Sequence, residues 1–352
     1  MSSSQFELTD PPRDAISALK FAPNDANKLL VSSWDRNVYL YDTHDGESGR
    51  LTRTFEHPAP VLDVCFGQDD NEAFTAGLDW NVRRINLETG ELEFLSSHTA
   101  GVKSVAYSST TKLLISGSWD CTLHVHSLSD DRSAHTTCTV PLPSKPFSIS
   151  MTPTKVVVAM ANRAVYIYDL KSLALLCSHA NSTDNTQNIV EIEPLQRRES
   201  AMKFMTRAIA CMPNDSGWAA STIEGRIAVE WFDPSETSQA RKYAFKCHRQ
   251  TVDGVDVVYP VNALAFHPIH GTFVSGGGDG VVAVWDGVAK RRIRQYQRFP
   301  TSVAALAFSA NGKYLAVAVS PGFEDGKEDP EGVVKVFIRE LGESETKGKA
   351  SK

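Results

Sequence analysis

The stretch Ser275–Asp286, with the sequence SGGGDGVVAVWD, decides the fold of this chain. Three glycines leading into Asp279-Gly280 predict a tight turn, because glycine adopts positive φ without steric cost and an Asp carboxylate accepts hydrogen bonds from nearby backbone amides. The residues from Val281 to Trp285 predict a short buried strand, since β-branched and aromatic residues favour strands. A fold built on this turn and strand should repeat them along the chain.

The closing Trp285-Asp286 pair resembles the signature of WD-repeat propeller blades. An acidic or Asn turn residue stands three positions before an alternating apolar strand at seven places: Asp35, Asp79, Asp120, Asn162, Glu224, Asp279 and Glu331. Successive spacings are 44, 41, 42, 62, 55 and 52 residues, and the first three match the WD-repeat period of about 40 to 45. The pattern therefore predicts seven repeats.

A second strand signal precedes each of these turns. It consists of the triplets Leu19-Lys20-Phe21, Val64-Cys65-Phe66, Val105-Ala106-Tyr107, Ile149-Ser150-Met151, Ala210-Cys211-Met212, Leu264-Ala265-Phe266 and Leu306-Ala307-Phe308. The separation from triplet to turn is nearly constant except in the seventh repeat, where a Gly- and acid-rich insertion is expected over residues 320–329. The longer spacings place a polar connection over residues 177–200, and a basic segment and a loop over residues 232–257.

These signals predict an all-β fold, a seven-bladed WD-repeat β-propeller with four strands in each blade. One domain is expected over residues 5–340. The segment Phe6-Glu7-Leu8 has no hairpin partner of its own, so we expect it to pair with the last blade and close the ring, which removes exposed strand edges. Residues 341–352 are charged and are expected to form a disordered tail.

Composition limits the class of protein. Hydrophobic residues make up 41% and charged residues 22% of the chain, which is typical of a soluble globular protein. A formal net charge of -6 gives no general attraction to nucleic acid or anionic lipid, so anion binding needs a local basic patch. The sequence shows neither a secretory signal nor an apolar run of membrane-spanning length. The 6 cysteines are scattered singly, which favours reduced thiols and the cytosol or nucleus.

No catalytic or metal-binding motif stands out, and we expect a non-enzyme without a cofactor. The chain has neither a GxxxxGK[ST] phosphate loop nor a GxSxG elbow, and the glycines before Asp279 precede a strand rather than a helix. His124 and His126 share one strand face, but no ligand of matching spacing stands near them, so a structural pairing is favoured over a metal site. The turn carboxylates are explained as hydrogen-bond acceptors, which leaves no acid pair for general acid-base chemistry.

Two tryptophans suggest a binding surface. The turns of repeats one and three place Trp34 and Trp119 directly before the turn aspartate, at hairpin tips where burial is difficult. Exposed indoles are natural anchors for a peptide that lies across a propeller face. The alternative is that each indole packs on a neighbouring blade.

A local run of cations is the second feature. It lies in and between repeats five and six and contains Arg197, Arg198, Lys203, Arg207, Arg226, Arg241, Lys242, Lys246 and Arg249. Long cations at converging strand ends suit carboxylate or phosphate recognition through charge-assisted hydrogen bonds. A solvated surface without a ligand is the alternative.

Four segments carry a family resemblance: Glu224–Glu230 (EGRIAVE), Tyr243–Arg249 (YAFKCHR), Tyr259–Asn262 (YPVN) and Phe299–Ser302 (FPTS). They resemble the mitotic-checkpoint propeller of the budding-uninhibited-by-benzimidazole group, and the resemblance covers essentially the whole chain. The messenger-RNA-export propeller of the nuclear pore shares the Lys-Cys-His-Arg segment. The run Val229-Glu230-Trp231-Phe232-Asp233 and the pair Tyr259-Pro260 favour the checkpoint family.

The resemblance implies a checkpoint adaptor that binds the GLEBS motif of the checkpoint kinase and of its pseudokinase-like relative. It also implies docking on phosphorylated Met-Glu-Leu-Thr repeats of the outer-kinetochore scaffold. Arg226 and Lys246 match the pair used for phosphothreonine, whereas the positions used for the GLEBS peptide are matched by Trp34, Trp119, Lys203 and Arg207. A nuclear and cytoplasmic protein that reaches kinetochores in mitosis is expected. The acidic loop over residues 323–331 and the connection over residues 181–188 depart from the family pattern.

Two other functions remain open. An export propeller would bind a nucleoporin GLEBS motif and RNA-associated partners, and a generic WD-repeat adaptor, such as a ligase substrate receptor, would bind neither set. No direct contact with nucleic acid or membrane is expected, and the propeller should act as a monomer within hetero-complexes.

Overall fold

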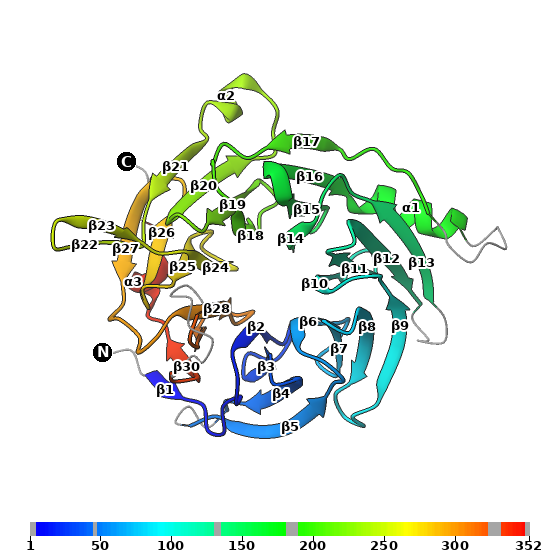
Figure 1. Cartoon of the computed structure of the whole chain (residues 1–352), viewed down its shortest axis with the longest axis horizontal. Helices are drawn as coiled ribbons and strands as arrows, with labels where there is room; N and C mark the ends of the chain where they lie inside the picture. The colour runs from blue at the N-terminus through cyan, green and yellow to red at the C-terminus, as the bar shows by residue number, and fades with distance from the viewer. Residues whose placement is uncertain (1–4, 45–47, 130–134, 181–188, 323–331, 349–352) are drawn as a thin grey trace.

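The computed structural model of the chain describes residues 5–44, 48–129, 135–180, 189–322 and 332–348. Within these residues seven four-stranded antiparallel sheets stand around a central axis like the blades of a propeller (Figure 1). The first strand of each sheet contacts the first strands of its neighbours, so these strands line the centre and the fourth strands lie at the rim. The predicted seven-bladed, all-β propeller is confirmed.

The first four blades follow one another along the chain. Blade 1 contains β2 (Ile16–Phe21), β3 (Lys28–Ser33), β4 (Asn37–Asp42) and β5 (Arg50–Glu56). Blade 2 contains β6 (Val61–Phe66), β7 (Glu72–Gly77), β8 (Asn81–Asn86) and β9 (Leu92–Ser97). Blade 3 contains β10 (Val102–Ser108), β11 (Leu113–Ser118), β12 (Thr122–Leu128) and β13 (His135–Pro141). Blade 4 contains β14 (Pro146–Met151), β15 (Lys155–Met160), β16 (Ala164–Asp169) and β17 (Gln196–Glu199), with a short 3-10 turn, η1 (Ala161–Arg163), between β15 and β16.

The last three blades complete the ring. Blade 5 contains β18 (Thr206–Cys211), β19 (Gly217–Thr222), β20 (Arg226–Trp231) and β21 (Tyr243–Lys246). Blade 6 contains β24 (Val261–Phe266), β25 (Phe273–Gly277), β26 (Val282–Asp286) and β27 (Arg291–Gln295). Blade 7 contains β28 (Val303–Phe308), β29 (Tyr314–Val319), β30 (Lys335–Glu340) and the N-terminal strand β1 (Gln5–Glu7).

The repeat pattern in the sequence located the blades correctly. All seven apolar triplets fall in the first strands, with Met212 directly after β18. Six of the seven turn residues lie between the second and third strands of their blades. The seventh, Glu331, lies outside the described residues, as do most of the insertion expected over residues 320–329 and the connection over residues 181–188.

The N-terminal strand closes the ring as predicted. β1 pairs antiparallel with β30, and Phe6 stands opposite Ile338. The amide of Leu8 then donates to the carbonyl of Val336 at 2.9 Å, and the Leu8 side chain is buried in the core between blades 7 and 1. The blue N-terminus and the red last strand lie side by side in Figure 1. Closure leaves the third strand of blade 7 paired on both edges.

The core lies between adjacent blades rather than within one. A typical cluster joins Leu30 and Val38 of blade 1 with Val64 and Ile85 of blade 2, and all four side chains are fully buried. Burying a side chain of this kind stabilises the fold by about 1.5 to 3 kcal/mol. Each blade therefore depends on its two neighbours, and the rigid ring fixes the positions of the turns at its two ends.

Helix α1 (Leu170–Ala180) is the main element that the sequence prediction missed. The sequence predicts a polar connection over residues 177–200, whereas the helix begins directly after β16 and extends into the first residues of that connection. The Asp169 carboxylate accepts from the Ser172 amide at 2.8 Å, and Leu170, Leu173 and Cys177 are buried against β12 and β13. The spacing of those three residues is that of an amphipathic helix. No helix in the described part of the chain is long and apolar enough to cross a membrane.

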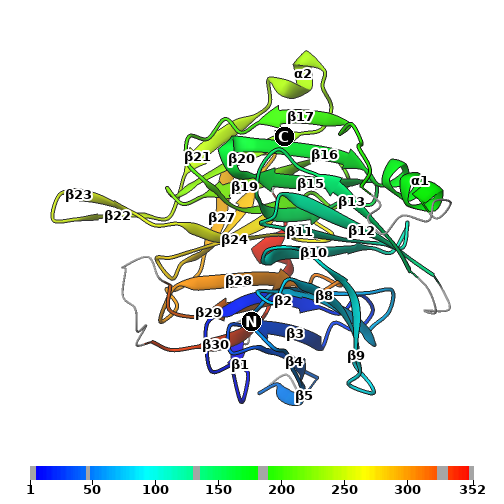
Figure 2. The same cartoon turned by 45° about the vertical axis from the view of Figure 1, so that its right-hand side comes forward.

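The basic segment and loop predicted over residues 232–257 also contain regular structure. A short helix, α2 (Glu236–Gln239), precedes β21, and a hairpin of β22 (Arg249–Val252) and β23 (Val255–Val258) projects from the propeller between blades 5 and 6 (Figure 2). Gly254, with φ +78°, forms its tip together with Asp253.

The C-terminal tail differs from the prediction of disorder over residues 341–352. Residues 341–348 are described, and they contain the short helix α3 (Glu343–Thr346). Glu345 and Thr346 are buried against blades 6 and 7. The prediction considered only apolar surface, whereas this segment is held by charged and polar partners. Residues 349–352 lie outside the described part.

Candidate binding surfaces on the propeller

Antiparallel topology brings two kinds of segment to one end of the ring. In each blade the turn between the second and third strands lies at the same end as the connection from the fourth strand to the next blade. We call this end the turn face. Among the sequence-predicted residues, it carries Trp34, Trp119, Lys203, Arg207, Arg226 and Lys246 at turns, connections or strand ends.

The turn in the stretch Ser275–Asp286 is held by a buried chain of hydrogen bonds. The Asp279 carboxylate accepts from His248 Nδ1 at 2.8 Å and from the Val281 amide at 3.1 Å. His248 Nε2 is 2.8 Å from Ser275 Oγ, which accepts from Trp285 Nε1 at 2.8 Å. The carboxylate thus reaches back to the connection from blade 5. This contact explains why an acidic residue stands at the turn.

Blade 3 repeats part of this arrangement. His98 Nδ1 is 3.0 Å from Asp120 Oδ2, and His98 Nε2 is 3.0 Å from Ser116 Oγ. Burial alone would raise the pKa of Asp120, but hydrogen bonds from His98 and Thr122 hold that pKa well below its usual range. The turn acids of blades 3 and 6 are therefore structural, and no catalytic role is needed to explain them.

The histidines of β12 also have structural partners. His124 stacks on His98 with ring centroids 3.5 Å apart, and Ser96 Oγ lies within hydrogen-bond distance of both His124 and His126. Burial, followed by the neighbouring His98, lowers the pKa of His124 to about 3. Within the described residues, no group of three His, Cys, Asp or Glu side chains is arranged to hold a metal ion.

Tryptophans stand at the turns of three consecutive blades. Trp34 is 36% exposed, as expected for an anchor. Trp119 is less exposed than an anchor would be, because its indole packs on Gly101. A Cβ added to Gly101 would lie 2.9 Å from that indole. Sequence reasoning missed Trp80, which is 50% exposed and has φ +69°. It follows the turn aspartate of blade 2 instead of preceding it, so the pattern that found the other two did not include it.

Exposed apolar groups accompany the cations of blade 5. Phe204 and Met205, on the connection into β18, are exposed, and the Met205 carbonyl accepts from the amide of the exposed Ile223. Lys203 Nζ lies 6.0 Å from the Phe204 ring centre, and Arg207 Nε donates to Asn262 Oδ1 at 3.1 Å. This part of the turn face can therefore contact both apolar and acidic groups of a peptide.

The four residues matched to the GLEBS peptide come from different blades. Trp34 lies in blade 1 and Trp119 in blade 3, whereas Lys203 and Arg207 lie at the entry to blade 5. A single ligand that contacts all four must extend over the turn face from blade 1 to blade 5, which lie on different sides of the ring in Figure 1. The turn face suits an extended peptide rather than a compact small molecule.

Arg226 and Lys246 are brought together by strand register. They stand directly opposite each other at the ends of β20 and β21, where cross-strand side chains are about 5 Å apart at Cβ. Arg226 Nε lies 3.3 Å from Glu224 Oε1, and Lys246 is exposed. Gly225, with φ +64°, makes this turn feasible, because an added Cβ would lie 2.6 Å from the Cys247 carbonyl oxygen. Two adjacent cations at an exposed edge form a candidate anion site.

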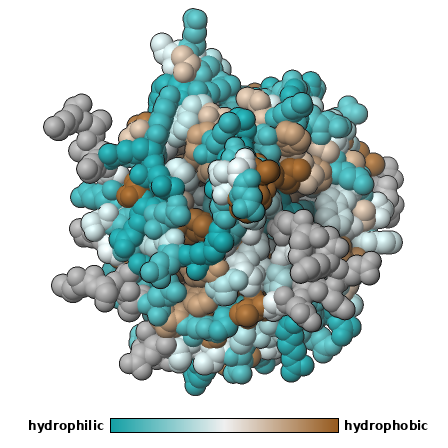
Figure 3. Space-filling view, turned by 60° about the vertical axis from the view of Figure 1, so that its left-hand side comes forward, coloured by the Kyte–Doolittle hydropathy of each residue, from teal (hydrophilic) through white to brown (hydrophobic). Residues whose placement is uncertain are grey.

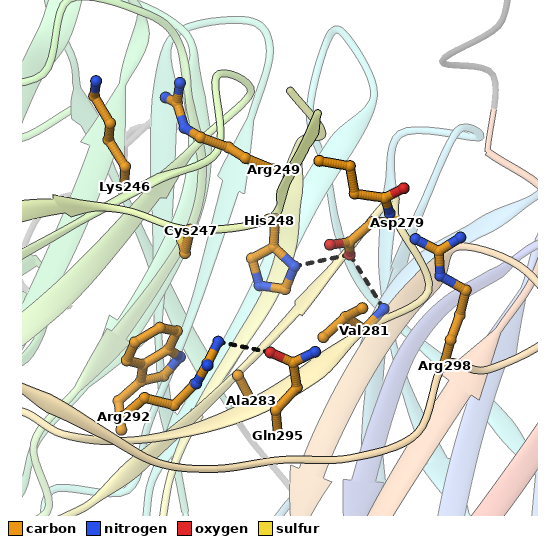
Figure 4. A pocket seen from close by; sticks show the side chains of 12 residues that line it. Lys246, Cys247, His248, Arg249, Asp279, Val281, Ala283, Arg292, Gln295 and Arg298 are labelled. Carbon is orange, nitrogen blue, oxygen red and sulfur yellow. Dashed lines mark hydrogen bonds and ion pairs between the residues drawn. The ribbon is translucent and has the colours of Figure 1, made fainter. Parts of the chain in front are cut away.

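A pocket of about 420 Å³ adjoins this pair between blades 5 and 6 (Figure 4). Lys246, Arg249, Arg292 and Arg298 bring four cations to its wall. Arg249 donates to the Glu224 carbonyl at 2.9 Å, and Arg292 donates to Gln295 at 2.6 Å. Sequence reasoning missed Arg292 and Arg298, although the cation-rich segment 290–298 was a usable signal. The side of the molecule with these blades is largely polar, with apolar groups in separate small patches (Figure 3).

Several other cations of the predicted run are engaged within the protein. Arg198 is 3.7 Å from the buried Glu230 carboxylate, and Lys242 is 3.6 Å from the same group. Arg241 stacks on Trp231 at 4.4 Å, and Arg197 pairs with Glu193 at 2.5 Å. For these four residues internal contacts explain the charge without a ligand. Arg226 also has an internal partner in Glu224, but its direct pairing with the exposed Lys246 makes these two the better candidates for anion binding.

Comparison with known proteins agrees with this architecture. The family described as WD domain, G-beta repeat matches residues 3–42, 90–127 and 242–286. The chain is 44% identical over 350 residues to the mitotic checkpoint protein BUB3.1 of Arabidopsis thaliana, covering 97% of this chain and 94% of that protein. It is 39% identical over 332 residues to mitotic checkpoint protein bub3 of Dictyostelium discoideum, covering 93% and 92%.

The chain belongs to the BUB3 family of mitotic checkpoint proteins. The related protein Rae1 of Drosophila melanogaster is 31% identical over 345 residues, covering 95% of this chain and 93% of that protein. The BUB3 family relatives named above thus share more identical residues with the chain than this Rae1 relative does. The predicted choice of the checkpoint family over the export family is confirmed.

Proposed function

We propose that this chain is a non-enzymatic adaptor of the spindle assembly checkpoint. Membership of the BUB3 family supports a checkpoint role, and the WD-repeat propeller supports a scaffold rather than a catalyst. In this proposal the turn face binds GLEBS motifs of the checkpoint kinase and its pseudokinase-like relative. The Arg226–Lys246 pair binds phosphorylated Met-Glu-Leu-Thr repeats of the kinetochore scaffold. The protein would be nuclear and cytoplasmic, and at kinetochores in mitosis.

The cross-strand pairing of Arg226 with Lys246 carries the phosphopeptide part of the proposal. A phosphothreonine at neutral pH carries close to two negative charges and three acceptor oxygens. Two cations held on neighbouring strands can each donate to it without rearranging the backbone, since the register fixes their separation. The basic wall of the adjoining pocket adds a favourable field for further acidic groups of the same peptide.

The GLEBS part of the proposal depends on the mixed character of the turn face. Trp34 and Trp119 would supply apolar contact area, and Lys203 and Arg207 would pair with glutamates of the peptide. Trp80 lies at the turn of the blade between those of Trp34 and Trp119, so it would extend the apolar surface. Because these residues and the phosphothreonine pair lie on different blades or at different edges, the two ligands could bind at once.

Affinity purification from mitotic cells tests both parts. The wild-type chain should recover a checkpoint kinase and the kinetochore scaffold. A Trp34→Ala/Trp119→Ala variant should lose the kinase, whereas Arg226→Ala/Lys246→Ala should lose the scaffold and keep the kinase. Arg241→Ala removes the same kind of charge from a residue engaged with Trp231, so it is the matched control.

Three outcomes would contradict the proposal. Recovery of nucleoporin and RNA-associated proteins in place of the checkpoint set would favour the export function. Recovery of neither set would favour a generic adaptor. Loss of the kinase and the scaffold together from the Arg226→Ala/Lys246→Ala variant, with the Arg241→Ala control intact, would contradict two separate binding surfaces.

A further inference from the structure

The C-terminal segment 341–348 is anchored across the junction of blades 6 and 7. At its start the Leu341 amide donates to the Lys313 carbonyl at 2.8 Å. At its end the Thr346 carbonyl accepts from Thr272 Oγ1 at 2.7 Å, and Thr346 Oγ1 lies 3.0 Å from His270 Nδ1. Thr346 is fully buried. The segment therefore occupies a defined position in the fold.

Glu345 occupies a carboxylate site built from both blades. Its side chain is 7% exposed, and Oε1 lies 2.7 Å from Arg294 Nη1 and 3.4 Å from Arg339 Nη2. Oε2 accepts from the Tyr296 hydroxyl at 3.2 Å. Arg294 and Tyr296 belong to the rim of blade 6, and Arg339 belongs to β30 of blade 7, with its guanidinium 4.4 Å from the Tyr296 ring centre. Charge-assisted bonds of this kind are among the stronger ones in proteins.

The segment fills only one end of a larger groove. A pocket of about 930 Å³ continues from Glu345 along the boundary of the two blades. Its wall combines basic, amide and aromatic groups, including Arg298, Gln297, Phe299 and Phe337. Such a wall suits a peptide with acidic side chains, because it offers both hydrogen-bond donors and apolar contact.

The segment is also held in a way that permits release. Residues 342–346 read Gly-Glu-Ser-Glu-Thr, without an apolar side chain to bury. Its attachment depends on polar contacts, which an equivalent ligand can replace one for one. Because the segment is tethered, its effective concentration near the site is of millimolar order, so it blocks weak competitors.

We propose that the groove between blades 6 and 7 is a binding site for an acidic peptide of a partner, and that Glu345 blocks it in cis. A glutamate or aspartate of the partner would take the place of the Glu345 carboxylate between Arg294, Arg339 and Tyr296. The rest of the partner peptide would lie along the open groove. The site contains neither Arg226 nor Lys246, although Arg298 lines both this groove and the pocket beside that pair.

The test uses the full chain and a fluorescein-labelled peptide with the sequence of residues 341–352 as the probe. Glu345→Lys in the chain places a third cation beside Arg294 and Arg339, so the segment should leave its site. The labelled peptide should then bind this variant at least tenfold more tightly than the wild-type chain. Val288→Lys adds a positive charge at a position that is 71% exposed and does not line the groove, and it should behave as wild type.

Two further arms identify the contact. A peptide in which the glutamate equivalent to Glu345 is replaced by glutamine should bind the Glu345→Lys chain at least tenfold more weakly. Adding Arg294→Gln to that chain should have a similar effect. Equal binding of the peptide to the wild-type and Glu345→Lys chains would overturn the proposal. If neither chain binds the peptide while Glu345→Lys lowers the melting temperature, the segment is only a structural clasp and the proposal is wrong.

Discussion

Replacing Asp279 by alanine tests the structural explanation of the turn acids. The substitution removes two hydrogen bonds to a buried carboxylate, from His248 Nδ1 at 2.8 Å and from the Val281 amide at 3.1 Å. It also leaves the His248 N–H buried without an acceptor, since that side chain is 1% exposed. Hydrogen bonds to charged groups contribute about 1.5 to 3 kcal/mol each, and the released desolvation cost of the carboxylate offsets part of that sum. We expect Asp279→Ala to lower the free energy of unfolding by about 3 kcal/mol.

Asp79 is the matched control, because it occupies the same turn position in blade 2. Its contacts with Asn81 are long, at 3.4 Å, and the side chains of its ion pair with Arg83 are 13–14% exposed, against 1–4% for the His248–Asp279 pair. Asp79→Ala should therefore cost about 1 kcal/mol. Urea denaturation followed by tryptophan fluorescence measures both variants against the wild-type chain. Equal losses for the two variants would refute the claim that the buried His248 contact distinguishes these turns.

Three other perturbations have calculable outcomes. The depressed pKa of Asp120 stabilises the folded state fully above the ordinary carboxyl pKa of 3.8, and this stabilisation declines as the pH falls below that value. The urea concentration at the unfolding midpoint should therefore fall less between pH 5 and pH 3 in Asp120→Asn than in the wild-type chain. An equal fall in both chains would contradict this. Gly225→Ala should lower the free energy of unfolding by about 2 kcal/mol, because Gly225 has a positive φ and its added Cβ would approach the Cys247 carbonyl closely. Gly254 also has a positive φ but has open space around it, so Gly254→Ala should lower the free energy of unfolding by about 1 kcal/mol. Leu8→Ala should lower the free energy of unfolding by about 3 kcal/mol, because Leu8 is buried in the core between blades 7 and 1. The exposed Leu92→Ala should lower it by less than about 0.5 kcal/mol, and similar values for the two variants would argue against closure by the N-terminal segment.

The fold was predictable because its signals repeat. A turn residue followed by an alternating strand, as in Asp279 to Trp285, recurs in all seven repeats, with Asn162 in place of an acid in the fourth, so an error in one repeat is corrected by the others. The pairing of the strand Phe6-Glu7-Leu8 was predictable because the last blade would otherwise have an exposed strand edge. Helix α1 occurs once, and its signal, Asp169 before the helix with Leu170, Leu173 and Cys177 on one face, has the period of a helix rather than that of the strands that repeat along the chain.

The candidate site was predictable in part. Arg226 and Lys246 were chosen from charge and family resemblance, but their direct pairing depends on the register of β20 and β21, which is set by the sheet as a whole. Trp80 was missed because it stands after its turn aspartate. The position of the C-terminal segment was not predictable from its composition, because Glu345 is bound by Arg294 and Arg339. Arg294 is about fifty residues away in the sequence, and only the fold brings it to Glu345.

The central claim is that a phosphate on threonine is recognised by Arg226 and Lys246. Fluorescence anisotropy should be measured with two Met-Glu-Leu-Thr peptides of the same sequence, one phosphorylated and one not. Two charge-assisted bonds of about 1.5 to 3 kcal/mol each predict at least a hundredfold tighter binding of the phosphorylated peptide to the wild-type chain. Arg241→Ala should keep that preference, and Arg226→Ala/Lys246→Ala should abolish it. Equal affinities for the two peptides, or a double variant that still prefers the phosphorylated one, would contradict the account.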